Sequence, residues 1–247
     1  MLIEQSAYSN RWRQVSPAAK GLFALCGMVA VFIAKTPGIA CGIALLLCLT
    51  TLVGAGVPSV RYLRVAAPAL LFLAMSGATL AASLQSGPVS GMTVQLVPAG
   101  LARAAQVCGR SLGGLTALLF LALTTPLTDL IALLRRLKMP EALLDIMVLC
   151  YRMLFVFAES AHAIRVAQTA RLGYGSISRS FRSLGALVAA ITLQVWQRSL
   201  ALHQAALARN NDGPFRFLEP SFPAAGRQLA VACSAGAGLI ALAVVLP

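Results

Sequence analysis

The stretch GLFALCGMVAVFIAKTPGIACGIALLLCL, residues 21–49, contains two apolar runs that are separated only by KTPG at 35–38. A helix needs about 20 mostly apolar residues to cross the hydrocarbon core of a bilayer. Proline fixes the backbone angle φ and lacks an amide hydrogen, so Pro37 favours a sharp turn between the runs. The sequence therefore predicts two consecutive membrane-spanning helices, at about 20–36 and 38–54.

The composition of the whole chain agrees with a membrane protein. Of its 247 residues, 59% are hydrophobic and only 11% are charged, and the mean hydropathy is +0.82. A soluble domain would have about 25% charged residues. Three more runs are long and apolar enough to span, at about 65–84, 104–124 and 227–246. We therefore expect an all-α, polytopic membrane protein with about five transmembrane helices.

Two other apolar runs, at 142–158 and 184–196, are interpreted as amphipathic helices that lie against the membrane or a partner. A span at 142–158 would place Asp145 and Arg152 in hydrocarbon, at a cost of about 2.5–3.5 kcal/mol each. The second run has only thirteen residues, which is too short to span.

Lysine and arginine are concentrated on one side of the predicted spans. Three precede the first span, two lie between the second and third, and eleven lie in 125–226, whereas the loop at 85–102 has no charged residue. Because loops rich in Lys and Arg stay in the cytoplasm, we expect the N-terminus and 125–226 there, with the C-terminus outside a bacterial cytoplasmic membrane. The predicted domains are a membrane domain at 1–124 with four spans, a cytoplasmic helical domain at 125–226, and a C-terminal transmembrane helix at 227–247.

Small and charged residues inside the spans predict helix contacts. Arg110 lies within the fourth span and is expected to face a protein neighbour, because lipid would leave its charge without a partner. The spacings Gly38-x-x-x-Gly42 and Gly109-x-x-x-Gly113 would let helices approach closely.

The cytoplasmic domain is predicted to contain two long helices that each end in Ala-Arg. The first runs from Pro140 to Arg171, and Gly173 or Gly175 is expected to take the left-handed position after it. The second ends at about Arg209, before a break. The role of each arginine has two interpretations. In the first, a cation at a helix C-terminus complements the macrodipole and stabilises the helix by about 0.3–1 kcal/mol. Alternatively, an arginine beside a small alanine is a docking group whose guanidinium bonds carboxylates and carbonyls of a partner.

A family resemblance extends these observations. The run LRRLKMPEALLDIMVLCYRMLFVFAESAHAIRVAQTARLGYG at 134–175 resembles the transmembrane T component of energy-coupling-factor (ECF) transporters, in particular the cobalt-transport CbiQ subfamily, as does VSPAAKGLFAL at 15–25. The residues that match the family pattern in the longer run are Leu137, Pro140, Asp145, Tyr151, Arg152, Glu159, Arg165, Ala170 and Arg171. The resemblance covers about residues 12–213.

The resemblance implies a scaffold without catalysis of its own. It would join a membrane-embedded, metal-binding substrate-binding subunit to two ABC-type ATPase subunits, and a small accessory membrane subunit is a further option. The helices that end at Arg171 and Arg209 would be crossing coupling helices, each inserting into one ATPase groove. ATP-driven closure would move the helix ends together and tilt the substrate-binding subunit.

The same resemblance assigns site residues. The implied ATPase-coupling motifs are Ala170-Arg171-Leu172 and Ala208-Arg209-Asn210. Family members often have glycine at the third position, so Leu172 and Asn210 depart from the pattern. Weaker contacts, with the substrate-binding subunit or in packing, are implied for Asp145, Tyr151, Arg152 and Arg110.

Several functions are not expected of this chain. It has no G-x-x-x-x-G-K-[ST] phosphate loop, so ATP would be bound by another chain. His162 and His203 have no second ligand at helical spacing, so we expect neither a metal site nor a cofactor here, and no nucleic-acid partner. Nickel or a vitamin remains an alternative substrate to cobalt. A membrane-embedded enzyme would need ionisable residues clustered in the spans, and a self-sufficient channel or carrier would show repeated membrane segments, which are not found.

Overall fold

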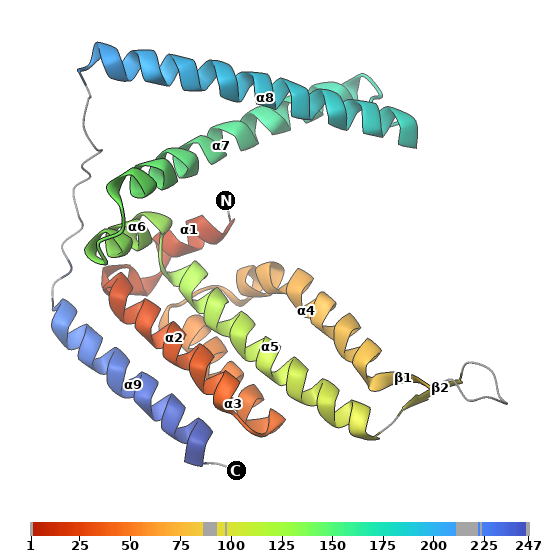
Figure 1. The fold of residues 1–247 in the computed structure, drawn as a ribbon, viewed down its shortest axis with the longest axis vertical. Coiled ribbons are helices and arrows are strands. Elements are labelled where there is room, and N and C mark those ends of the chain that lie inside the picture. The colour runs from red at the N-terminus through yellow and green to blue at the C-terminus, as the bar shows by residue number, and fades with distance from the viewer. Residues whose placement is uncertain (1, 86–92, 97, 211–221, 223, 246–247) are drawn as a thin grey trace. The chain divides into compact units, whose positions relative to one another are not determined.

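The computed structural model describes residues 2–85, 93–96, 98–210, 222 and 224–245. These residues form helices and one short hairpin (Figure 1). Contacts group them into two compact units, one of Met1–Leu133 with Pro220–Pro247 and one of Leu134–Glu219. The prediction of a helical, polytopic membrane protein is confirmed, because four helices in the first unit are long and apolar enough to cross a membrane.

The first unit contains the elements up to α6, whose last residues from Leu134 on are grouped with the second unit, together with α9. Its helices are α1 (Leu2–Ser9), η1 (Arg11–Gln14), α2 (Pro17–Ile33), α3 (Pro37–Leu49), the π-helical turn η2 (Thr50–Gly54), α4 (Ser59–Ala81), α5 (Pro98–Thr124), α6 (Leu127–Arg136) and α9 (Ala225–Val245). The strands β1 (Ala82–Gln85) and β2 (Thr93–Leu96) pair antiparallel, with Ala82 opposite Leu96. This hairpin occupies part of the predicted uncharged loop.

The four candidate spans are Pro37–Gly54, Ser59–Ala81, Gly100–Thr124 and Ala225–Val245. The predicted first span is apolar but shorter, since α2 has 17 residues, at the lower limit for crossing a bilayer. It ends at Ile33 because Thr36, which precedes Pro37, must be extended, and α3 begins directly at that proline. The tight connection predicted from Pro37 is therefore confirmed.

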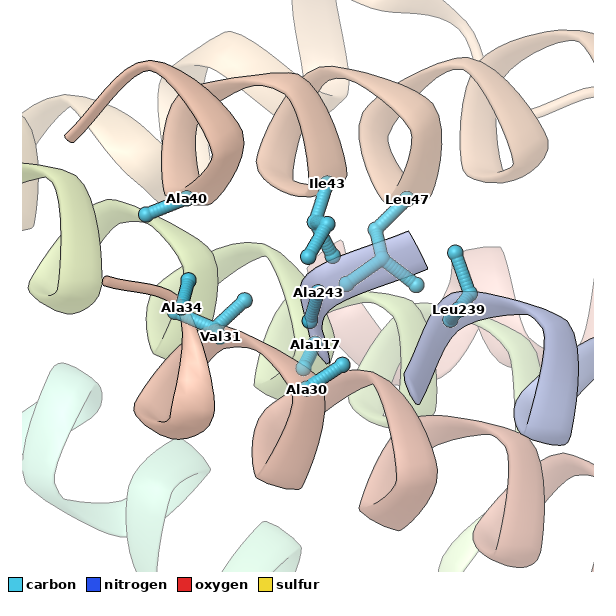
Figure 2. Packing of buried hydrophobic residues seen from close by; sticks show 9 residues of the cluster. All are labelled: Ala30, Val31, Ala34, Ala40, Ile43, Leu47, Ala117, Leu239 and Ala243. Atoms are coloured by element: carbon cyan, nitrogen blue, oxygen red, sulfur yellow. The ribbon is translucent and has the colours of Figure 1, made fainter. Parts of the chain in front are cut away.

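The core of the first unit lies where α2, α3, α5 and α9 meet (Figure 2). The cluster shown consists of Ala30, Val31, Ala34, Ala40, Ile43, Leu47, Ala117, Leu239 and Ala243. Glycine makes this packing possible, because a Cβ at Gly113 would lie 2.5 Å from Val31. The close approach predicted at Gly109 and Gly113 is thus confirmed. A Cβ at Gly38 or Gly42 would meet no described atom within 4 Å, so no contact within the described chain uses that pair.

Polar side chains from the N-terminal segment close the C-terminal end of α5. The Asn10 amide donates to the backbone carbonyls of Leu123 (3.3 Å) and Thr124 (3.1 Å), and Lys20 Nζ donates to the Thr124 carbonyl (2.9 Å). These donors satisfy carbonyls that have no partner within the helix, and the ammonium complements its dipole. Nearby, burial raises the pKa of the Asp129 carboxyl above its ordinary value, against the opposing influence of Arg13 and Lys20.

The second unit is built from two long helices, α7 (Glu141–Ala170) and α8 (Ile177–Ala208), which run antiparallel. Hydrogen bonds join them at two levels. Gln168 Nε2 donates to the Ser183 carbonyl at 2.9 Å, and Gln194 Nε2 donates to Ser160 Oγ at 3.0 Å. Figure 1 shows the helices crossing near their connecting turn and diverging away from it. Neither helix is among the candidate spans. That 142–158 and 184–196 lie against the membrane or a partner stays a prediction.

Candidate functional site

The C-terminal end of α7 presents Arg171 to solvent. Ala170 is the last helical residue, Arg171 is the C-cap and its side chain is exposed. The Leu172 amide donates to the Thr169 carbonyl at 3.0 Å, and the Gly173 amide donates to the Gln168 carbonyl at 2.9 Å. These two bonds form a Schellman motif, which satisfies the last carbonyls of the helix and stops it at this residue.

Leu172 occupies the left-handed position of this motif, with φ of +56°. The prediction that Gly173 or Gly175 takes this position is wrong, since neither is among the described residues with positive φ. Glycine is preferred at a left-handed position because it has no Cβ to clash with the backbone. The geometry gives a physical reason for glycine as the third residue of this motif, and Leu172 accepts the strain with its side chain 70% exposed.

The turn after Arg171 is held by side chains that the sequence interpretation missed. Tyr174 donates its hydroxyl hydrogen to Gln168 Oε1 at 2.8 Å, and Ser183 Oγ donates to the Gly173 carbonyl at 2.9 Å. Gly173 is needed for close approach, because a Cβ there would lie 2.7 Å from Ser183 Oγ and 2.8 Å from the Gln168 carbonyl oxygen. The bond from Gln168 to Ser183 completes the network and fixes Arg171 relative to the start of α8.

The C-terminal end of α8 repeats the backbone geometry. Ala208 is the last helical residue, Arg209 is the exposed C-cap, and Asn210 is left-handed with φ of +52°. The Asn210 amide donates to the Leu207 carbonyl at 3.0 Å, the same bond that Leu172 makes after α7. Asparagine tolerates this backbone region better than other residues that carry a Cβ. The break predicted after residue 210 lies outside the described residues.

The two arginines lie far apart. Arg171 is joined to the beginning of α8 by the short turn, whereas Arg209 directly follows its end. The turn after Arg171 is bonded to Ser183, and the part of α8 from Ser183 to Ala208 corresponds to about 38 Å at 1.5 Å per residue. In the part of the chain that the structure describes, no hydrogen bond or ion pair engages either guanidinium. Two exposed guanidinium groups, each with several directional donors, are therefore presented at separate places.

The weaker predicted site residues are distributed over both units. Asp145, Tyr151 and Arg152 lie on α7, where the Tyr151 ring packs edge-on against Phe155 with centroids 5.2 Å apart. Arg110 lies on α5 and donates to the Ala34 carbonyl at 3.2 Å, which closes the C-terminal end of α2. The expectation that Arg110 faces protein is confirmed. Arg110 belongs to the first unit and the three α7 residues belong to the second.

An apolar stripe follows one side of α8 on the solvent surface. Phe181, Leu184 and Val188 are spaced three or four residues apart and are each more than half exposed. Large exposed apolar patches typically mark interaction surfaces. Among the described residues, no group of three or more His, Cys, Asp or Glu side chains could hold a metal ion.

Comparisons with known proteins bear on this arrangement. The family described as Cobalt transport protein, CbiQ, matches residues 9–217. The cobalt transport protein CbiQ of Rhodobacter capsulatus is 35% identical over 245 residues, covering 99% of this chain and 98% of that protein. The cobalt transport protein CbiQ of Salmonella typhimurium is 31% identical over 209 residues, covering 79% of this chain and 90% of that protein.

A protein of Methanocorpusculum labreanum named "Putative fused cobalt transport protein CbiMQ" is 29% identical over 219 residues, covering 86% of this chain and 37% of that protein. The family match includes both long helices and most of the membrane unit. The chain belongs to the CbiQ family of cobalt transport proteins, the T component of ECF transporters.

Proposed function

We propose that this chain is the energy-coupling subunit of a cobalt importer, in which it transmits the motion of two ATPase subunits to a membrane-embedded substrate-binding subunit. The observation that carries this proposal is the repeated geometry at the two helix ends. Arg171 and Arg209 are both exposed C-caps that follow an alanine and precede a left-handed residue. A dipole-complementing cation alone would not require the same three-residue arrangement twice.

Two separate arginines fit a pair of identical partners. Each guanidinium can bond carboxylates and backbone carbonyls in a groove, and the neighbouring alanine keeps the helix end narrow. The part of α8 from Ser183, which bonds the turn after Arg171, to Ala208 keeps the two ends about 38 Å apart, so each would contact a different ATPase subunit. The chain has no phosphate-loop pattern, so ATP hydrolysis would take place on those partners.

The substrate-binding subunit would contact the apolar stripe formed by Phe181, Leu184 and Val188, which is exposed along α8. Burial of such a surface by a partner is favourable at about 25 cal/mol per Å². The relative named as a fused cobalt transport protein CbiMQ supports an association with a CbiM-type subunit, because fusion keeps two partner chains together. The family favours cobalt as the substrate over nickel or a vitamin, and the metal would be held by the partner.

The docking role is tested by reversing charge at each helix end. Arg171→Glu and Arg209→Glu, expressed with the ATPases and the substrate-binding subunit, should each reduce co-purification of the ATPases and cobalt uptake by at least tenfold. A carboxylate would face the acceptor groups that the guanidinium bonds, and loss of a buried charged hydrogen bond costs about 2–5 kcal/mol. The matched control is Arg198→Glu, which makes the same change at an exposed position within α8.

Wild-type levels of assembly and uptake in both end variants would contradict the docking role. An equal loss of co-purification and uptake in the Arg198→Glu control would mean that the effect comes from the overall charge of the unit. Cobalt flux through liposomes that contain this chain alone would favour a self-sufficient channel or carrier instead.

A further inference from the structure

A cavity of about 560 Å³ lies in the first unit, between α2 and α9. Its walls include Trp12 of η1, Phe23 of α2, Phe120 of α5 and Val231 of α9. The rings of Phe23 and Phe120 pack edge to face with centroids 5.4 Å apart, which gives the cavity an aromatic wall. The volume is within the range of about 300–1,000 Å³ for small-molecule sites.

The two helices contact each other on both sides of this cavity. At one end, the Ser16 amide donates to Gln228 Oε1 at 2.8 Å. Further along, a Cβ at Gly236 would lie 2.7 Å from Cys26 Cβ, so the helices touch there. The eight residues from Gln228 to Gly236 correspond to about 12 Å along α9. The cavity therefore occupies about the first three turns of this candidate span, the end that would lie near the lipid headgroups.

The charges at the cavity are positive. Lys20 and Arg227 both line it, and among the described lining residues none carries a carboxylate. Lys20 is buried and its Nζ donates to the Thr124 carbonyl, whereas Arg227 is exposed in the first turn of α9. Arg11 and Arg13 of η1 lie at the same end, where the Asp129 carboxyl offsets part of the charge of Arg13 and Lys20 and leaves Arg227 as the exposed cation of the cavity. The distribution of Lys and Arg predicts that this end faces the cytoplasm.

We propose that this cavity binds an anionic phospholipid of the cytoplasmic leaflet, with an acyl chain between α2 and α9 and the headgroup phosphate at Arg227. The apolar walls fit a hydrocarbon chain, and a guanidinium binds phosphate through two parallel hydrogen bonds. Basic pockets between membrane helices on the cytoplasmic side bind anionic headgroups in this way. The site is separate from the two helix ends and does not depend on the docking role proposed for them.

Trp12 provides a direct probe, because it lines the cavity and the chain has only one other tryptophan, Trp196 in α8. In a Trp196→Phe background, the full chain is reconstituted into phosphatidylcholine vesicles that contain increasing amounts of brominated phosphatidylglycerol or brominated phosphatidylcholine. Bromine on an acyl chain quenches tryptophan emission at contact. We expect half-maximal quenching of Trp12 at an about fivefold lower fraction of the anionic lipid, the preference that one basic side chain provides.

Three variants separate the site from general attraction of the protein for anionic lipid. Arg227→Gln should remove the preference while Trp12 still fluoresces. Arg103→Gln, the same change at an exposed arginine on α5, should retain it. Ala235→Phe should reduce quenching by both lipids, because Ala235 lines the cavity and a ring there would fill it.

Equal quenching of Trp12 by the two lipids, or an unchanged preference in Arg227→Gln, would overturn the proposal. The last measurement adds soluble glycerol phosphate at millimolar concentration as a competitor of the anionic lipid. If it abolishes quenching by the anionic lipid, the site binds phosphate without the acyl chain and the lipid assignment is wrong; undiminished quenching supports the lipid.

Discussion

The ends of α7 and α8 share a backbone geometry but differ in how their arginines are supported. After α7, side chains of Gln168, Tyr174 and Ser183 bond across the turn and tie it to α8. After α8, the cap of Arg209 rests on backbone bonds among the described residues. Among the described residues, one end is thus held by side-chain bonds to α8 and the other by its helix cap.

This difference predicts that the two proposed docking groups have unequal freedom before binding. A group held by surrounding bonds loses little conformational entropy on docking, whereas a group on an unsupported helix end loses more. We therefore expect substitutions in the turn to weaken docking at Arg171 without affecting Arg209. The following predictions test that asymmetry in the full chain, by hydrogen exchange of the amides in the turn and by ATPase co-purification.

Gly173→Ala should have the largest effect. Its Cβ would lie 2.8 Å from the Gln168 carbonyl oxygen, so the backbone of the turn must shift, at a cost of about 1–3 kcal/mol. Amides in the turn should then exchange about 5- to 150-fold faster. The matched control is Gly185→Ala on α8, where a Cβ meets nothing within 4 Å. Similar protection in wild type and Gly173→Ala would show that the turn is not tightly packed.

Tyr174→Phe should have a smaller effect, because it removes one hydrogen bond, to Gln168 Oε1, and keeps the ring. Such a bond contributes about 0.5–1.5 kcal/mol. Protection of the turn should fall about two- to tenfold, while protection at the end of α8 stays unchanged. Equal changes at both ends would contradict the independence of the two helix ends.

Leu172→Gly should have the smallest effect and the opposite sign. Relief of the left-handed strain, about 1–2 kcal/mol, exceeds the entropy that glycine loses on folding, about 0.5–1 kcal/mol. The turn should become slightly more protected. Asn210→Gly is the counterpart at the other end and should change little, since asparagine already tolerates that conformation. A greater gain from Asn210→Gly than from Leu172→Gly would refute this account of the strain.

The sequence pattern predicted much of this architecture. Hydrophobic run length located the membrane helices, and Pro37 marked the turn between α2 and α3. The start of α4 was placed too late, at 65 instead of Ser59, because Arg61 and Arg64 interrupt the apolar run. The two arginines do not interrupt the helix itself. Arg61 is accommodated near its start, where it donates to Ser6 Oγ at 3.0 Å. The family resemblance predicted that the two helix ends are coupling motifs.

The structure of the turn could not be predicted from local preference. Leucine rarely adopts positive φ, so the two following glycines were better candidates for the left-handed position. The choice depends on Ser183, which reaches the Gly173 carbonyl only after α8 folds back along α7. Likewise, nothing local reveals that Asn10 closes a helix that ends more than a hundred residues later.

Under the proposed function, the continuous helix α8 would limit how the complex can move. Because the locked turn attaches Arg171 to one end of α8 and Arg209 follows the other, their separation is as fixed as the length of the helix. If two ATPase subunits held both arginines as proposed, they could not draw the helix ends together, as the family resemblance implies, unless α8 bent or the turn opened. Their stroke would instead rotate α8 as a rod, and a rotation of about 10° about its middle displaces each end by about 4 Å.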